Sequence, residues 1–230
     1  MADLPAAAGR VVGAALGGLA RARRGKPMHP RGAVFTATLV RHGGGPDGHA
    51  WGVPWLDTTA SDRATVRLSR GAGLPDPLPD LLGLAVRVPS GSGAPVDLLL
   101  TTTGRGRFRR LVPAPRRDSA AVYSSIMGYR SDAGTLRFAA LPEDDEVPSE
   151  PRPLAAVVER AGLSFTLAVA RGGGPWVPFG RLVLDAPVDP LDPDVRFDAV
   201  LNPPPGLLPD GPMARFRAPA YVRARAARRG

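Results

Sequence analysis

The stretch ATVRLSR at residues 64–70 decides the fold class, because apolar and polar side chains alternate along it as far as Ser69. Successive side chains of a β-strand point to opposite faces, so a period of two predicts a strand with one buried face. Val66 and Leu68 are expected to face the core, while Arg67 and Ser69 face the other way. The sequence therefore predicts a half-buried strand here.

Six further runs are rich in β-forming residues and are separated by glycine and proline. Short strands joined by turns, with few long helices, favour an antiparallel barrel or sandwich. We therefore expect an α+β fold that is mainly β, with helices at its periphery. The further expected strands are Ala33–Val40, Leu84–Val88, Val96–Thr103, Thr135–Ala140, Leu163–Ala170 and Pro178–Leu184. The expected helices between strands are Leu78–Leu82, Ser119–Met127 and Leu154–Arg160.

The composition places the chain among globular proteins and excludes every kind of site that needs cysteine. With 230 residues and 43% hydrophobic content, the chain is long enough for one domain with a substantial core. It contains no cysteine, which excludes disulfides, thiolate catalysis and iron–sulfur clusters. The lack of cysteine also suits a reducing compartment, so we expect a cytoplasmic protein.

The net charge of +9 does not by itself indicate nucleic-acid binding. Lys26 is the only lysine, and the arginines are spread from Arg10 to Arg229. A dispersed excess of positive charge mainly affects solubility and non-specific attraction to polyanions. We therefore expect no specific nucleic-acid partner. Salt-sensitive binding through the arginine-rich tail, residues 223–230, is the weaker alternative.

Residues 1–25 are predicted to form an N-terminal amphipathic helix, because the valines and leucines of residues 5–24 fall on one helical face. This run is too short and too rich in glycine to span a bilayer, so we expect no transmembrane segment. Residues 26–230 show no internal repeat and no clear linker. We expect them to form a single domain.

Two segments at opposite ends of that domain carry the candidate chemistry. His29 follows Lys26 and Pro27 and precedes a Pro-Arg-Gly corner, which would hold its ring rigidly at the entrance to the first strand. Arg217 and Tyr221 are four residues apart, so they share a face if the segment is helical. A guanidinium beside the phenol oxygen favours the phenolate, which is a hard anionic ligand for ferric haem.

Several motifs resemble those of the catalase family, and they occur in the family's order. They cover about residues 26–104 and 195–228, and residues 105–194 show no matching motif. The matching segments are MHPRGA (28–33), TVRLSRGAG (65–73), DLLGLAVRV (80–88), VDLLLTTT (96–103), RFDAVLNPPPGLLP (196–209) and MARFRAPAY (213–221).

The resemblance implies a catalase-like antiparallel β-barrel that binds haem b and reacts with hydrogen peroxide or an organic peroxide. His29 would be the distal proton shuttle, and the Ser69 hydroxyl would support it. Tyr221, held by Arg217, would be the iron ligand. The residues expected to bind the haem propionates are Arg67, Lys26 and, as the weakest match, Arg228.

Departures from the family pattern modify the expected activity. Thr101 stands where the family has an asparagine that helps to orient peroxide, and a hydroxyl is shorter and less directed than an amide. We therefore expect peroxidase-type oxidation of a small donor, or modest dismutation. The chain is shorter than ordinary catalases, so we expect a barrel and haem core without their accessory helical domain. Whether it forms a homo-oligomer stays open.

The competing hypothesis is a catalase-like barrel without haem. A catalase-like barrel that has lost haem could bind a small ligand or act as a phosphodiesterase-type hydrolase, since arginines that clamp a propionate can also clamp a phosphate. Thr101 and the divergent tail after Tyr221 favour this alternative. A visible absorption spectrum after reconstitution with haem distinguishes the two.

Overall fold

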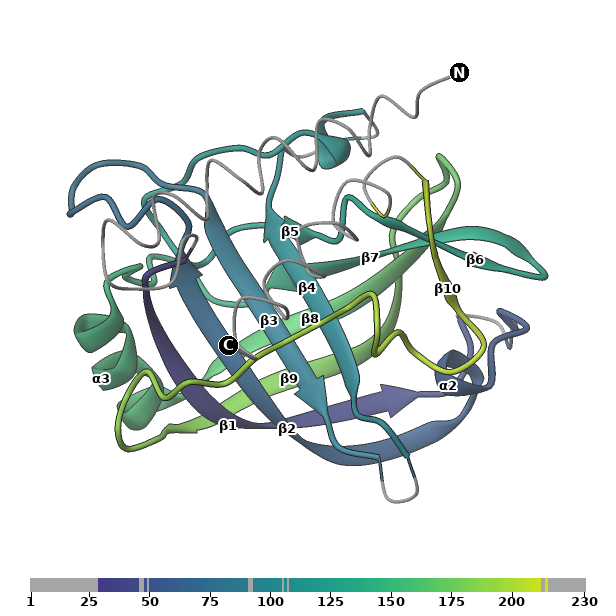
Figure 1. Ribbon diagram of the computed structural model, residues 1–230, viewed down its shortest axis with the longest axis horizontal. Helices are drawn as coiled ribbons and strands as arrows, with labels where there is room; N and C mark the ends of the chain where they lie inside the picture. Colours follow the sequence, from purple (N-terminus) through teal and green to yellow (C-terminus); the bar gives the residue numbers. More distant parts are fainter. Residues whose placement is uncertain are drawn as a thin grey trace, which may run out of the picture.

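The computed structural model describes residues 29–45, 48, 50–90, 93–104, 106, 108–211 and 214 (Figure 1). The helix predicted over residues 1–25 lies outside this part of the chain, and so do Lys26, Arg217, Tyr221 and Arg228. Within the described ranges, no helix combines the length and the apolar character needed to cross a membrane.

The described chain forms one antiparallel sheet that closes into a barrel. The sheet order is β10-β6-β7-β5-β4-β3-β2-β1-β9-β8, and β8 pairs back onto β7, so that the eight strands from β7 to β8 make the barrel. Strands β6 and β10 extend the sheet beyond β7. The strands are β1 (Arg31–His42), β2 (Thr59–Arg70), β3 (Leu82–Val88), β4 (Val96–Thr102), β5 (Tyr123–Ser124), β6 (Gly128–Ser131), β7 (Gly134–Pro142), β8 (Leu163–Arg171), β9 (Val177–Pro187) and β10 (Leu208–Asp210). The predicted antiparallel barrel is confirmed.

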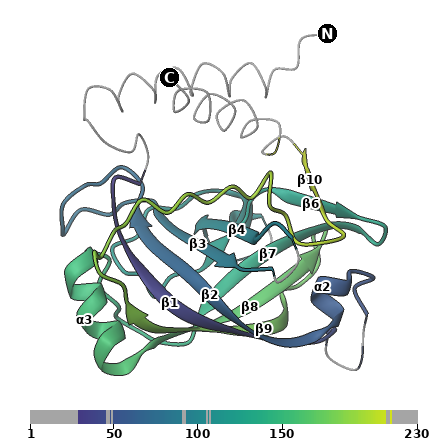
Figure 2. The same cartoon turned by 60° about the horizontal axis from the view of Figure 1, so that its bottom comes forward.

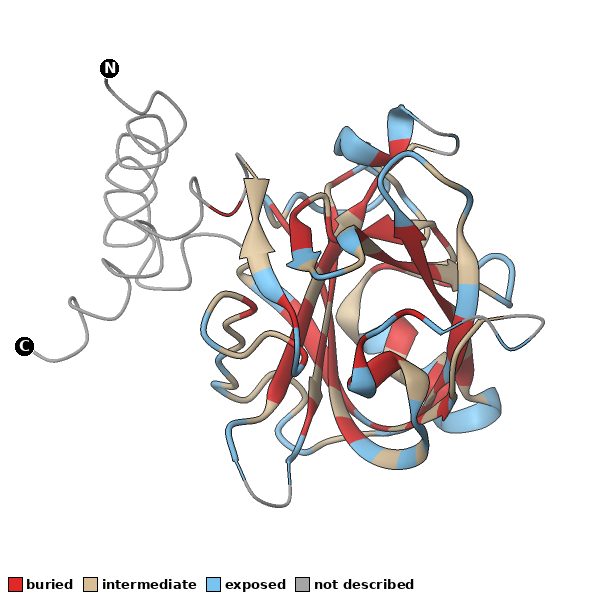
Figure 3. Cartoon of the chain, turned by 90° about the vertical axis from the view of Figure 1, so that its right-hand side faces the viewer, coloured by how far each residue is buried: buried red, intermediate tan, exposed pale blue. Residues whose placement is uncertain are grey.

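The barrel interior is filled by the apolar face of the strands. Val66 and Leu68 are buried in the core as predicted, and the central Phe138 makes edge contacts with Trp55 at 6.2 Å and with Phe179 at 5.8 Å between ring centroids. Figure 3 shows that buried residues are concentrated in the strands, whereas exposed residues lie mainly in the connections. Because the interior is packed, a site for a large ligand has to lie on the outer face.

All seven predicted strands are present, but two of the three predicted helices are wrong. Residues 78–82 are not helical: Asp80 forms an isolated bridge with Arg116, and Leu82 already begins β3. The carboxylate of Asp80 holds this extended segment by accepting hydrogen bonds from the backbone of Ala72, Leu74 and Leu81 at 2.7–3.0 Å. The predicted helix Leu154–Arg160 is confirmed as part of α3 (Pro151–Ala161). Two short helices that the sequence did not predict are α2 (Pro54–Asp57) and η2 (Arg109–Leu111).

Residues 119–127, predicted as a helix, contain β5 instead. Tyr123 is fully buried in this strand, which lies between β4 and β7 and completes the barrel. Its hydroxyl donates to Ser119 O at 3.0 Å, and its ring meets the ring of Phe165 edge-on. Burial raises the pKa of Tyr123 well above its ordinary value. The side chain therefore belongs to the core of the barrel.

A long connection, residues 188–207, crosses the outer face of the barrel from β1 to β4; we call it the strap (Figure 2). At β1, Val34 N donates to Leu191 O at 2.8 Å and Val34 O accepts from Val188 N at 3.0 Å. At β4, the side chain of Asn202 donates to Asp97 at 2.8 Å. The strap is therefore fixed at both edges of the face that it crosses.

Asp97 is the main anchor of the strap, and its side chain is fully buried. It accepts two hydrogen bonds from Arg87, at 2.8 and 2.7 Å, and one from Asp198 N at 2.8 Å. The hydrogen bond to Asp97 raises the pKa of Arg87 above its ordinary value, against the opposing effect of burial. A buried carboxylate with this many donors is well compensated, so losing it leaves several groups unpaired.

Replacing Asp97 by alanine is therefore expected to destabilise the fold strongly. The loss leaves Arg87 and the strap donors without their acceptor, which costs about 3 kcal/mol in the free energy of unfolding. Urea unfolding measures this. The control is Arg63→Gln, which removes an exposed ion pair to Asp185 and is expected to cost at most about 1 kcal/mol. Equal stability of the two variants would show that Asp97 is not the anchor.

Candidate functional site

His29 lies just before β1, on the outer side of the barrel. Its backbone has φ 55°, in the left-handed region that non-glycine residues rarely adopt. Its N–H donates to Gly71 O at 2.8 Å, which ties this turn to the end of β2. The backbone thus turns sharply at His29 and directs the chain into the first strand.

The imidazole of His29 contacts the hydroxyl of Ser69. Ser69 Oγ lies 2.9 Å from His29 Nδ1 and also donates to Gly83 O at 3.4 Å. The Ser69 hydroxyl has one hydrogen, so when it donates to Gly83 O it accepts a hydrogen bond from His29 Nδ1–H; on this basis we assign the Nδ1–H tautomer to the neutral ring. This assignment leaves the lone pair on Nε2, which makes that nitrogen the proton acceptor.

Gly83 forms the floor under the imidazole. A Cβ at this position would lie 2.6 Å from His29 Cε1, 2.9 Å from Nδ1 and 3.0 Å from Ser69 Oγ. Neither ring nor hydroxyl can withdraw without losing the contact between them, so only glycine fits. The sequence motif contains Gly83, but only the structure shows that it makes room for the histidine.

Thr101 lies in the same cross-strand row as Ser69 and Gly83. Ser69 pairs with Gly83, and Gly83 pairs with Thr101 on the next strand. Thr101 Oγ1 donates its hydrogen to Leu82 O at 3.1 Å. In this conformation the hydroxyl can accept a hydrogen bond from a ligand but has no second hydrogen to donate.

Arg67 connects the histidine to the strap. It donates to both carboxylate oxygens of Asp192, at 2.8 and 2.9 Å, and to His29 O at 3.0 Å. Its side chain is only 8% exposed. Gly32 makes room for it, since a Cβ there would lie 2.7 Å from the guanidinium carbon. The predicted role of Arg67 in binding a propionate stays a prediction, and Asp192 already holds this guanidinium.

The structure therefore brings two predicted site residues, Ser69 and Arg67, into contact with His29. Thr101 lies two strands away from Ser69 in the same row. The other predicted residues, Lys26, Arg217, Tyr221 and Arg228, lie outside the described residues. In the described part of the chain, no three histidine or acidic side chains are grouped closely enough to hold a metal ion.

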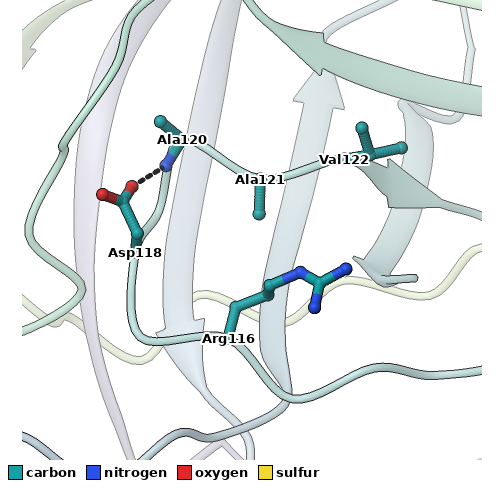
Figure 4. Close-up of a pocket in the computed structure, with 5 residues that line it drawn as sticks. All are labelled: Arg116, Asp118, Ala120, Ala121 and Val122. Atoms are coloured by element: carbon teal, nitrogen blue, oxygen red, sulfur yellow. Dashed lines mark hydrogen bonds between the residues drawn. The ribbon is translucent and has the colours of Figure 1, made fainter. Parts of the chain in front are cut away.

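A separate pocket of about 180 Å³ lies beside the connection that leads into β5 (Figure 4). The guanidinium of Arg116 extends away from the carboxylate of Asp118, and the remaining lining is apolar. Arg116 Nη2 donates to Thr103 O at 3.1 Å, and Asp118 Oδ1 accepts from Ala120 N at 2.6 Å. No sequence motif indicated this pocket, because residues 105–194 match none.

Comparison with known proteins identifies the fold. No family model matches the chain, and no curated protein matches it in sequence. A fungal catalase matches with a TM-score of 0.59 and 14% identity, over 93% of this chain and 62% of the catalase chain. A bacterial catalase matches with a TM-score of 0.58 and 14% identity, over 92% and 59% of the two chains.

The chain has a catalase-like fold. It spans about 60% of the length of these two catalases. At 14% identity the similarity shows the fold alone, and the fold does not fix the activity. The catalase-like barrel predicted from the motifs is confirmed at this level.

Substituting Gly83 by alanine tests the floor of the site. The added Cβ overlaps the ring of His29, so we expect a loss of about 1–3 kcal/mol in stability, as for other overpacked positions. Urea unfolding measures this loss. Gly93→Ala is the matched control, because its Cβ would meet nothing closer than 3.8 Å. A Gly83→Ala protein as stable as the control would contradict the described contact.

Proposed function

We propose that this catalase-like chain is a haem-dependent oxidoreductase that uses hydrogen peroxide or an organic peroxide to oxidise a small donor, with modest dismutation as a second activity. The observation that carries the proposal is the contact of Ser69 Oγ with His29 Nδ1 at 2.9 Å above Gly83. It supports a neutral imidazole with its acceptor nitrogen at Nε2. That is the group that peroxide chemistry needs for moving a proton.

The described residues fit one face of a haem group. His29 stands over Gly83, which has no side chain, and the small Ala85 is the next residue on the outer face of β3. A flat ring requires such a low surface beside the imidazole. The residues that would hold the haem are Tyr221 as iron ligand, Arg217 beside its phenolate, and Lys26, Arg67 and Arg228 at the propionates. Arg67 is already paired with Asp192. To bind a propionate, its guanidinium would have to contact both carboxylates or give up the one of Asp192.

When bound, the haem supplies the redox chemistry, and the protein supplies orientation and proton transfer. His29 Nε2 accepts the proton from one peroxide oxygen and returns it to the other. Ser69 keeps the ring in the tautomer that leaves Nε2 free of hydrogen. Because the hydroxyl hydrogen of Thr101 is donated to Leu82 O, Thr101 can only accept from the peroxide. Peroxide is then held less firmly than by a donor amide, which favours oxidation of a donor over rapid dismutation.

Reconstitution with haem tests the proposal. The protein is expected to develop a Soret absorption band and to oxidise a chromogenic donor with hydrogen peroxide. Tyr221→Phe should lose most of the band, because it removes the proposed iron ligand. His29→Gln should keep the band and lose peroxidase activity by about 10²-fold or more.

His42→Gln is the matched control, because His42 is exposed at the far end of β1 from His29. Its spectrum and activity should equal those of the unmodified protein. The proposal is wrong if the reconstituted protein shows no Soret band. It is also wrong if His29→Gln is as active as the control.

The pocket beside β5 favours a second candidate function, a haem-free binder of small anions or a phosphodiesterase-type hydrolase. Arg116 forms no ion pair with any carboxylate in the part of the chain that the structure describes, so its charge is available to a ligand. The neighbouring Thr103 hydroxyl is buried and has no hydrogen-bond partner among the described residues. A buried hydroxyl without a partner is typical of a site that takes a water molecule or a ligand.

Titration with inorganic phosphate, followed by the melting temperature, tests this second candidate. Binding should raise the melting temperature of the unmodified protein and of Arg63→Gln, which changes an arginine exposed elsewhere. Arg116→Gln should lose the effect. Equal shifts in both variants would mean that phosphate does not bind at Arg116. A colourless protein that hydrolyses a chromogenic phosphodiester would favour this candidate over the haem proposal.

A further inference from the structure

In the described part of the chain, the side chain of Asp192 links the strap to the candidate site. Both oxygens of Asp192 accept hydrogen bonds from Arg67, and the same guanidinium donates to the backbone carbonyl of His29. Arg67 and Asp192 are 125 residues apart in the chain. A continuous path of hydrogen bonds therefore leads from the strap to the backbone of the candidate proton shuttle.

His29 needs such support because of its backbone conformation. A left-handed φ costs a residue with a Cβ roughly 1–2 kcal/mol, and it persists only where neighbouring contacts fix it. Three described contacts do so. They are the hydrogen bond from His29 N to Gly71 O, the one from Arg67 to His29 O, and the contact of the ring with Ser69.

Arg67 in turn depends on Asp192. A guanidinium that is 8% exposed needs an opposite charge close by, and the two-point contact with a carboxylate fixes both its position and its plane. Replacing Asp192 by a neutral group leaves the guanidinium free to tilt towards solvent. The hydrogen bond from Arg67 to His29 O is then lost.

We propose that Asp192 is a positioning residue that acts through Arg67 on His29. By holding the guanidinium against the His29 carbonyl, it keeps the imidazole over Gly83 and its Nδ1–H on Ser69. The strap thereby controls the tautomer and place of the imidazole. The inference rests on the proposed function only in assigning proton transfer to the positioned imidazole. The positioning itself belongs to the protein without haem.

Nuclear magnetic resonance of the full chain, labelled with ¹⁵N and ¹³C in its three histidines and free of haem, tests the proposal. In the unmodified protein the His29 ring should be in the Nδ1–H tautomer. In Asp192→Asn the ratio of the two tautomers should fall about tenfold, as expected for the loss of one ordinary hydrogen bond. The His42 signals should stay unchanged.

Asp189→Asn is the matched control, because Asp189 is an exposed acidic residue on the same strap. Its His29 signals should equal those of the unmodified protein. Asp192→Glu keeps the carboxylate and should restore part of the tautomer ratio. Arg67→Lys serves if Asp192→Asn does not fold. A lysine retains the charge but has no planar fork to make the two-point contact with Asp192 while it donates to His29 O, so it should shift His29 in the same way.

A folded Asp192→Asn protein with unchanged His29 signals would overturn the proposal. So would equal displacement of the His29 and His42 signals, because it would mark a general loss of structure. Since the samples contain no haem, failure here leaves the proposed oxidoreductase activity untouched. Absence of a Soret band in the reconstitution experiment would likewise leave this result standing.

Discussion

The hydrogen bonds of the buried Asp97 carboxylate fix the strap that crosses the outer face of this barrel. This carboxylate gathers hydrogen bonds from Arg87 and from two residues of the strap, Asp198 and Asn202. Because the strap is fixed there and again at β1, its middle passes over β2 in a defined place. Asp192 then meets Arg67 on β2. The local geometry of the candidate site therefore follows from an anchor two strands away.

The division between the two faces of the sheet explains where chemistry can occur. Core side chains such as Val66 and Phe138 fill the interior, so a large flat ligand has no space there. On the outer face of β2, β3 and β4 the same alternation places Ser69, Gly83 and Thr101 in one row. Ser69 and Thr101 carry small polar side chains, and Gly83 leaves room for the imidazole. The similarity to two solved catalases supports the fold, and the side chains of this row support the proposed activity.

Local patterning predicted the strands well, because alternation is a property of neighbouring residues. It failed at residues 119–127, where β5 exists only through pairing with β4 and β7 and through burial of Tyr123. Local sequence patterns likewise predicted only part of the candidate site. The motifs identified His29 and Ser69, but Asp192 could not be found, since its role arises from a contact across 125 residues. The space that Gly83 provides also depends on a fold that brings the first described residue back over β3.

The central claim is that His29 faces a haem bound on the outer face of the barrel. Ferric haem is paramagnetic, so it broadens the signals of nuclei near it. Titration of ferric haem into histidine-labelled protein should broaden the His29 ring signals beyond detection. The signals of His42, at the opposite end of β1, should stay sharp. Sharp His29 signals at saturating haem, or equal broadening of both histidines, would contradict the account.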